Sequence, residues 1–369
     1  MKVVFRADAS LQIGSGHVMR CLTLAEALRA EGVECHFICR EHPGHLLDLI
    51  RNKGFSAYGL STADTSLDSD MPARQAVELT HASWLGATQL QDAKTCTPIL
   101  EKIMPDWLIV DHYALDAQWE TSLKAFFIRL LVIDDLADRK HICDLLLDQN
   151  LGHAEQDYTT LVPNNCRLMI GAQYALLRPE FARLRKQSLE RRGSPKLQHI
   201  LITMGGVDLA NATGVTLQTL KACPLPASCR ISVVMGIKSP YLAEVADAAA
   251  NMPWPTEVLV NITDMGERMV SADVVIGAAG STSWERCCLG VPTIMVVVAD
   301  NQKSGAEALL SSGSVTLIEQ VHDISVRLPE AMRALANENT LLGMSEKARK
   351  VCDGLGVLRV IRKMSDING

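Results

Sequence analysis

Short apolar runs that read as strands alternate with helix-length amphipathic segments along almost the whole chain. Continuous apolar strands separated by helices are typical of parallel sheets that helices cover on both faces. Two such sets predict an α/β chain with two doubly wound domains. The expected strands are 3–5, 34–38, 107–110, 129–133 and 144–147 in the first half, and 199–204, 230–234, 257–260, 274–276 and 293–298 in the second.

The division between the two domains is expected at 176–198, a highly charged stretch with two prolines and a glycine before a new strand begins. The predicted organisation is an N-terminal domain over 1–177, a linker over 178–198, a C-terminal domain over 199–345 and a helical tail over 346–369. The tail belongs to a helical pattern at 341–364 that is expected to fold back across the division. The stretch 61–71, rich in Ser, Thr and Asp, is interpreted as a surface insertion.

Composition and charge indicate a globular protein that does not bind nucleic acid or a membrane. The 369 residues are 48% hydrophobic and 21% charged, as in a globular protein, and the net charge of −6 implies no basic surface for nucleic acid. The eleven cysteines are odd in number and include no Cys-x-x-Cys, so we expect reduced thiols. The chain starts without an apolar signal-peptide core, and its apolar runs are too short to span a bilayer, so we expect a cytoplasmic protein without a membrane partner.

A glycine-rich turn at 14–20, with the sequence GSGHVMR, joins the first strand to an amphipathic helix. The backbone N–H groups of such a turn and the helix dipole attract an anion, and Gly14 and Gly16 would contribute to this site. His17 lies in the first turn of the helix, where the dipole favours the neutral ring that accepts a proton. Capping or anion contact is the simpler role for His17, but its position behind two glycines favours a base.

Two further glycine turns follow strands of the second half. The pair of glycines at 205–206 ends the strand at 199–204, although a tight turn that needs small residues gives the same pattern. In the segment 277–285, GAAGSTSWE, small residues allow a close backbone approach at a helix N-terminus. Glu285 is placed to accept both hydroxyls of a ribose, but Thr282 and Glu285 also fit a capping box.

Polar side chains also follow other strands at the edge where ligands bind in doubly wound sheets. Asp111 and Tyr113 follow the strand at 107–110, Asp134 and Asp135 follow 129–133, and Asn301 follows 293–298. A paired-carboxylate glycosidase is disfavoured because adjacent acids point in divergent directions. A divalent-metal site at this pair of acids is an unspecific alternative, and structural turn acids are the simpler interpretation.

Taken together, the motifs resemble a known family. A two-domain frame with GxGH in the first domain and Gly-Ser/Thr followed by Glu in the second is similar to the GT-B glycosyltransferases, in which two Rossmann-like domains face each other across a cleft. More closely, the chain resembles the PseG family, UDP-2,4-diacetamido-2,4,6-trideoxy-β-L-altropyranose hydrolases of pseudaminic acid biosynthesis. This resemblance runs from about residue 2 to 317 and rests on RADAS at 6–10, IGSGHVMR at 13–20, DHY at 111–113, GAQYALLR at 171–178, MGGVD at 204–208 and DNQ at 300–302.

The resemblance implies an inverting hydrolysis in which water attacks the anomeric carbon, with His17 as the general base, and UDP leaves. It implies no metal and no cofactor, and it connects the chain to flagellin glycosylation. A UDP-sugar is the expected small-molecule partner, while the oligomeric state stays open, with a monomer among the possibilities. The residues expected to bind substrate are Gly14, Gly16, Tyr113 near the sugar, Arg178, Gly205, Gly206, Gly280, Ser281, Thr282, Glu285 and Asn301.

Two other functions stay open. A GT-B glycosyltransferase would use the same base to activate an acceptor hydroxyl instead of water. A nucleotide-sugar binding module without catalysis predicts binding without turnover. A dehydrogenase is disfavoured because Ile38-Cys39-Arg40, rather than an acidic residue, ends the second strand.

Overall fold

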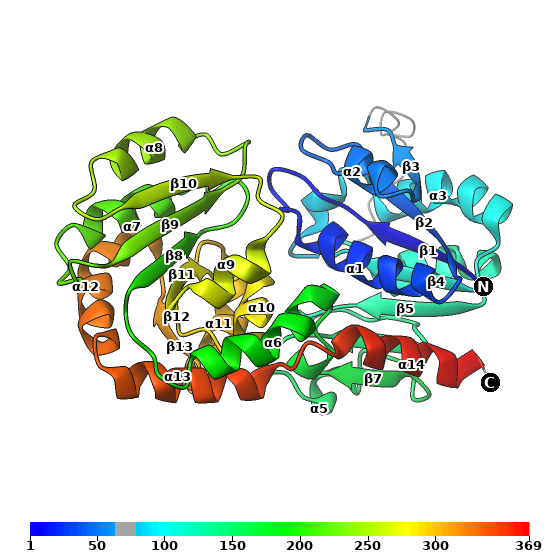
Figure 1. Ribbon diagram of the computed structural model, residues 1–369. Coiled ribbons are helices and arrows are strands. Elements are labelled where there is room, and N and C mark those ends of the chain that lie inside the picture. The colour runs from blue at the N-terminus through cyan, green and yellow to red at the C-terminus, as the bar shows by residue number, and fades with distance from the viewer. Residues whose placement is uncertain (63–78, 369) are drawn as a thin grey trace. The chain divides into compact units, whose positions relative to one another are not determined.

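The computed structural model describes residues 1–62 and 79–368. The chain divides into two compact units, unit 1 with Met1–Leu176 and Gly356–Gly369, and unit 2 with Leu177–Leu355. Each unit is built on a parallel sheet with helices on both faces (Figure 1). The prediction of two doubly wound α/β domains is therefore confirmed. The insertion expected at 61–71 lies almost wholly outside the described residues.

Seven strands form the described sheet of unit 1. They are β1 (Lys2–Ala7), β2 (Glu34–Arg40), β3 (Ser56–Leu60), β4 (Trp107–Asp111), β5 (Arg129–Ile133), β6 (Leu145–Asp148) and β7 (Arg167–Ile170). They pair in parallel in the order β3-β2-β1-β4-β5-β6-β7. Alternate residues of a strand point to opposite faces, and Val3, Val4 and Phe5 are all fully buried, so both faces of β1 are covered.

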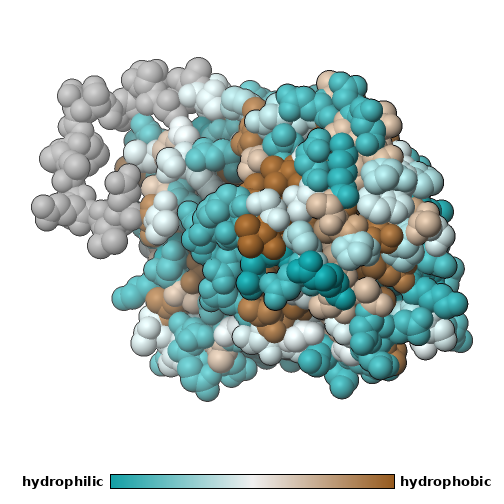
Figure 2. All heavy atoms as spheres, turned by 90° about the vertical axis from the view of Figure 1, so that its left-hand side faces the viewer, coloured by the Kyte–Doolittle hydropathy of each residue, from teal (hydrophilic) through white to brown (hydrophobic). Residues whose placement is uncertain are grey.

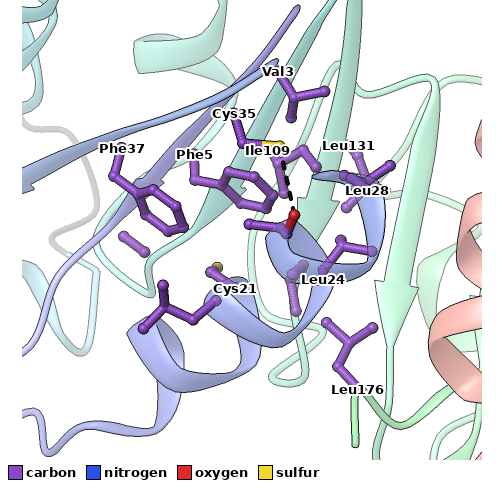
Figure 3. Packing of buried hydrophobic residues seen from close by; sticks show 14 of the residues in the cluster. Val3, Phe5, Cys21, Leu24, Leu28, Cys35, Phe37, Ile109, Leu131 and Leu176 are labelled. Carbon is purple, nitrogen blue, oxygen red and sulfur yellow. Dashed lines mark hydrogen bonds between the residues drawn. The ribbon is translucent and has the colours of Figure 1, made fainter. Parts of the chain in front are cut away.

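Helices cover both faces of this sheet. The helical segments are α1 (Gly16–Ala30), α2 (Leu47–Asn52), η2 (Ala82–Leu85), α3 (Gln89–Ile103), α4 (Ala117–Ser122), η3 (Lys124–Phe126), α5 (Glu155–Tyr158), η4 (Ala172–Tyr174) and α14 (Gly356–Asn368). Leu24 and Leu28 of α1 pack with Phe5 and Ile109 in the core of one face (Figure 3), and Val360 of α14 belongs to the same core. Residues of α3 and α4 bury the other face.

Unit 2 has a described sheet of six strands. They are β8 (His199–Thr203), β9 (Arg230–Met235), β10 (Thr256–Val260), β11 (Val274–Ala278), β12 (Thr293–Val296) and β13 (Val315–Ile318). All pair in parallel in the order β10-β9-β8-β11-β12-β13. Ile276 and Val275 on the two faces of β11 are both fully buried, so this sheet is also covered on both sides.

The helical segments of unit 2 are α6 (Pro179–Arg191), α7 (Ala212–Leu220), α8 (Leu242–Ala250), α9 (Met265–Ser271), α10 (Thr282–Cys288), η5 (Asp300–Gln302), α11 (Lys303–Ser311), η6 (Val321–Asp323), α12 (Ile324–Leu335) and α13 (Glu338–Val351). On one face, α7, α8 and α12 contribute Leu217, Val245 and Leu328 to a core with Ile202 and Ile276. This core packs against β8 and β11, and both strands lead into the glycine turns.

Each sheet has one point at which the strand order reverses, between β1 and β4 in unit 1 and between β8 and β11 in unit 2. Connections leave in opposite directions from the two strands at such a point and open a crevice at their carboxyl ends, where doubly wound proteins bind ligands. The turn at 14–20 follows β1, and the turns at 205–206 and 280–282 follow β8 and β11. The three predicted glycine turns therefore lie at the two switch points.

The predicted domain boundaries need correction. The expected linker at 178–198 contains α6, which belongs to unit 2 because Phe181 and Leu184 bury one of its faces. Unit 2 also extends beyond 345 to Leu355. The helix expected at 341–364 is broken after Val351, near Gly354 with its φ of 84°, and its second part, α14, belongs to unit 1. The tail expected at 346–369 is thus divided between the two units.

The face in Figure 2 is mostly hydrophilic, with hydrophobic residues in small separate patches. Scattered patches of this kind are ordinary on the surface of a globular protein. Within 1–62 and 79–368, none of the helices has the length and apolar character needed to cross a membrane.

Candidate functional site

His17 lies at the switch point of unit 1. The chain leaves β1, turns through Gly14 at a φ of 80°, and enters α1 at Gly16, so that His17 is the second helical residue. The turn is closed by a hydrogen bond of 2.9 Å from the Gly14 N–H to the Ser10 carbonyl. Ser15, at the N-cap, makes no side-chain capping bond, so its own side chain leaves this helix end open. The predicted residues Gly14, Gly16 and His17 are therefore together at one helix N-terminus.

Asp111, the last residue of β4, holds the ring of His17. Its Oδ1 lies 2.5 Å from His17 Nδ1, and its two oxygens accept from Arg20 Nη2 and Nε, both at 2.6 Å. Arg20 lies three residues after His17, so both reach Asp111 from one side of α1. Burial alone would raise the pKa of Asp111, but the Arg20 guanidinium, with help from His17, holds it far below its ordinary value. The ionised carboxylate accepts Nδ1–H, which leaves Nε2 of His17 to accept a proton.

Neighbouring residues at the end of β4 serve different networks, because alternate strand residues point to opposite faces. Asp111 points to α1, whereas His112 points to the other face, where its Nε2 lies 3.2 Å from Asp8 Oδ2. Asp8 also accepts hydrogen bonds of 2.6 Å from Arg6 Nη1 and from the backbone N–H of Arg40. These fully buried contacts tie together the carboxyl ends of β1, β2 and β4, and thereby fix the position of Asp111.

Tyr113 closes the network around His17. Its ring meets that of His17 edge-on, with the centroids 4.7 Å apart, and it lies next to Asp135. Asp135 Oδ2 in turn accepts a bond of 3.0 Å from Arg20 Nη1. Burial, followed by the nearby Asp135, raises the pKa of Tyr113, so the phenol stays protonated. His17, Asp111, Arg20, Asp135 and Tyr113 thus form a closed ring of contacts, hereafter the His17 network.

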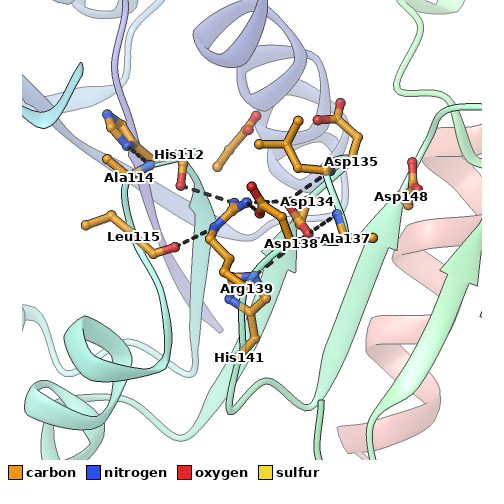
Figure 4. A network of polar contacts seen from close by, with 12 residues as sticks. His112, Ala114, Leu115, Asp134, Asp135, Ala137, Asp138, Arg139, His141 and Asp148 are labelled. Carbon is orange, nitrogen blue, oxygen red and sulfur yellow. Dashed lines mark hydrogen bonds and ion pairs between the residues drawn. The ribbon is translucent and has the colours of Figure 1, made fainter. Parts of the chain in front are cut away.

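The adjacent carboxylates Asp134 and Asp135 point in divergent directions, as expected. Asp134 pairs with Arg139 Nη1 at 2.8 Å (Figure 4), whereas Asp135 pairs with Arg20. Arg139 also donates to the Leu115 carbonyl at 2.9 Å and so fixes the loop after β4. Among the described residues, no group of three or more His, Cys, Asp or Glu side chains is arranged to hold a metal ion. The two acids have structural partners, as the simpler interpretation expected.

In unit 2, the turn after β8 is open. Gly205 has a φ of 96°, and no atom lies within 4 Å of the position that a Cβ would take at Gly205 or Gly206. The N-terminus of α7 is closed, however. The Asp208 carboxylate accepts from the N–H groups of Ala212 and Thr213, both at 2.9 Å. Because that carboxylate already interacts with the positive end of α7, an anion at this turn would be bound by the glycine backbone and not by the helix.

The turn after β11 is held by hydrogen bonds from a buried arginine. Arg286 donates to the Ala278 carbonyl at 2.7 Å and to Ser283 Oγ at 2.9 Å, and it lies against Gly277. In the described part of the chain, its Nε and Nη1 have no hydrogen-bond partner, and burial lowers its pKa to about 10. A Cβ at Gly280 would meet no atom within 4 Å. Arg286 therefore holds the turn at Ala278 and Ser283, while the space beside Gly280 is open.

Glu285 does not form the capping box that its spacing allows. The N-cap of α10, Ser281, has no side-chain capping bond, and Glu285 Oε1 instead faces Arg178 Nη2 at 3.8 Å. Arg178 also contacts Glu180 at 3.1 Å. Burial raises the pKa of Glu285 to about 7, although Arg178 opposes this shift. The structure thus brings Arg178 and Glu285 together, while Asn301 lies exposed on η5.

Sequence reasoning did not give Asp111, Arg20 and Asp135 a role beside His17. The spacing of His17 and Arg20 was a usable signal, because residues three apart lie on the same side of a helix. The pairing with Asp111 had no local signal, because it depends on β4 lying next to β1. The role of the buried Arg286 beside the turn after β11 likewise had no signal in the sequence.

The chain is similar to several known proteins in sequence and in fold. Residues 231–355 match the glycosyltransferase family 28 C-terminal domain. A UDP-2,4-diacetamido-2,4,6-trideoxy-β-L-altropyranose hydrolase of Campylobacter jejuni is 27% identical over 314 residues, which cover 85% of this chain and 97% of that protein. The spore coat polysaccharide biosynthesis protein SpsG of Bacillus subtilis is 25% identical, with coverage of 100% and 98%. MurG of Acinetobacter baumannii has a crystal structure with a TM-score of 0.71 to this chain at 17% identity, covering 99% of each. The chain therefore has the GT-B fold and is similar in sequence to a PseG-type hydrolase.

Proposed function

We propose that this chain is a UDP-sugar hydrolase that releases UDP and free 2,4-diacetamido-2,4,6-trideoxy-L-altrose, with inversion at the anomeric carbon, as a step of pseudaminic acid biosynthesis. The observation that carries the proposal is the contact of His17 with Asp111 and Arg20 at the switch point of unit 1. Similarity to the Campylobacter jejuni hydrolase supports the choice of substrate.

His17 is the general base of this reaction. Its Nε2 takes a proton from water while the water oxygen bonds to the anomeric carbon, and the bond to the phosphate oxygen breaks with its electron pair going to UDP. The Asp111 carboxylate stabilises the imidazolium that forms, and Arg20 keeps Asp111 ionised. UDP needs little protonation to leave, so a single positioned base, which contributes about 10²- to 10⁴-fold, is sufficient.

The turn after β11 and the pair Arg178–Glu285 bind the nucleotide. The open space above Gly280 allows a phosphate to approach the backbone N–H groups of 280–282, with Ser281 and Thr282 hydroxyls beside it. Glu285 accepts from the ribose hydroxyls, since no helix cap occupies its carboxylate. Arg178 contributes positive charge for the diphosphate. Gly205, Gly206 and Asn301 complete the predicted binding set at the carboxyl edge of the sheet.

A glycosyltransferase is the second candidate, because residues 231–355 match a glycosyltransferase family domain. The same His17 network would then deprotonate an acceptor hydroxyl. Metal binding does not distinguish the two reactions, but dependence on an acceptor does.

The test is to incubate the purified protein with UDP-2,4-diacetamido-2,4,6-trideoxy-β-L-altrose, without any acceptor, and to follow UDP release and the first-formed anomer of the sugar by NMR. The proposal expects stoichiometric UDP and free sugar of inverted configuration, and a His17→Asn variant serves as the control. UDP release only after addition of an acceptor would support a transferase. Binding without turnover would support a binding module.

A further inference from the structure

Beside the His17 network, two half-buried aromatic side chains extend the ring system of Tyr113. His81 and Trp84 come from the segment that forms η2, and no motif of the sequence includes them. The ring centroids of Trp84 and His81 lie 5.7 and 5.3 Å from that of Tyr113, and 4.4 Å from each other. Since Tyr113 meets His17 at 4.7 Å, the three rings form a continuous wall, hereafter the aromatic wall, that ends at the proposed base.

The aromatic wall is held in place from two sides. Leu85, next to Trp84, is 1% exposed and belongs to the core on the α3 face of the sheet. The ring of His42, which follows β2, lies against Gly86 at the end of η2. On the other side, Tyr113 is buried next to Asp135. The rings of Trp84 and His81 thus stay partly exposed although their backbone is anchored in the fold.

An anchored and partly exposed aromatic surface at this position is suited to binding the apolar face of a sugar. A pyranose has a face of C–H bonds, and a 6-deoxy sugar with acetamido groups adds methyl groups, whereas its carbonyl and hydroxyl oxygens remain polar. Aromatic rings present a negative face that attracts such C–H groups, and apolar lining with few polar groups is typical of small-molecule sites.

Resting on the proposed function, we propose that the aromatic wall of His81, Trp84 and Tyr113 is the subsite that binds the C–H face and methyl groups of the sugar, and that Trp84 and His81 contribute to selectivity for 6-deoxy acetamido sugars. The wall ends at His17, so a sugar lying along it presents its anomeric carbon to Nε2. These rings contact the sugar and not UDP, so removing one should weaken binding of the sugar nucleotide and leave the affinity for UDP unchanged.

The variants Trp84→Ala and Trp84→Phe are compared with the wild type for kcat, KM and UDP affinity, with Trp254→Ala as the control. Trp254 is also half-buried, but it lies in unit 2 and packs beside a core that includes Ile231. We expect Trp84→Ala to raise KM for the diacetamido sugar nucleotide roughly threefold to tenfold, without changing the affinity for UDP. We expect Trp84→Phe to have a KM close to that of the wild type, and Trp254→Ala to leave KM unchanged.

An unchanged KM in Trp84→Ala would overturn the inference, and so would an equal loss of UDP affinity, which would indicate a general structural defect. If the wild type hydrolyses no UDP-sugar, the proposed function fails while the subsite remains testable by calorimetry. The wild type should then bind UDP-2,4-diacetamido-2,4,6-trideoxy-β-L-altrose more tightly than UDP, and Trp84→Ala should lose this difference. Equal binding of both ligands by the wild type would contradict the subsite.

Discussion

The substitution Asp111→Asn tests the His17 network at its centre. It keeps the size of the side chain and removes the negative charge that lies 2.5 Å from His17 Nδ1. Two unit charges about 4 Å apart interact by about 4 kcal/mol at an effective dielectric constant of about 20. If the forming imidazolium loses this attraction, the barrier rises by a similar amount, and turnover falls about a thousandfold. Arg20 keeps its contact with Asp135 at 3.0 Å, so we expect the variant to fold.

The assay measures kcat and KM by UDP release, UDP affinity by calorimetry and folding by thermal denaturation. We expect a large fall in kcat with UDP affinity unchanged, because the proposed nucleotide contacts are made by other residues. The double variant His17→Asn/Asp111→Asn should be no slower than His17→Asn alone, since both residues act through one proton transfer. Turnover within about tenfold of the wild type, or multiplicative losses in the double variant, would refute the reasoning.

Three further predictions follow from single residues. Replacing His17 by Asn should lower turnover about 10²- to 10⁴-fold and leave UDP binding intact; near-full turnover would exclude it as the base. Gly277→Ala should destabilise the fold by about 1–3 kcal/mol, because its Cβ would meet Arg286 Nη1 and lie 2.9 Å from the Thr203 carbonyl. Gly280→Ala, whose Cβ would meet no atom within 4 Å, should have the stability of the wild type but bind UDP more weakly. Denaturation and calorimetry separate these two effects, and equal stability of both variants would contradict the packing argument. Burial raises the pKa of Glu285 from an ordinary 4.5 to about 7, so its contribution to stability is complete below pH 4.5 and is lost as the pH rises through 7. Glu285→Gln should therefore gain stability relative to the wild type between pH 5 and 8, by roughly 3 kcal/mol at most, and a constant difference in melting temperature would contradict this.

The central strands of both sheets could be predicted from the sequence, whereas three edge strands could not. The central strands are buried on both faces and read as continuous apolar runs, so each was predicted to within a few residues, and β5 with its observed bounds, Arg129–Ile133. The edge strand β3, with the sequence SAYGL, is only half-buried and includes a glycine. The edge strands β7 and β13 have four residues each, which is too short for a clear pattern.

The glycine turns, His17, Tyr113 and Glu285 were within reach of the sequence because their signals are local. The partner of His17 was not, since Asp111 lies 94 residues away and reaches it only because β4 pairs with β1. The same holds for Arg178 and Glu285, which approach each other through the packing of α6 and α10. Whether Glu285 caps its helix was also undecidable from spacing, because a capping box and a free carboxylate share one pattern.

Hydrolysis in water labelled with ¹⁸O tests the central claim most directly. If His17 and Asp111 activate water for attack at the anomeric carbon of the UDP-sugar, mass spectrometry should find the label on C1 of the released sugar and none in UDP. Label in the terminal phosphate of UDP, with unlabelled sugar, would mean attack at phosphorus and would contradict the account.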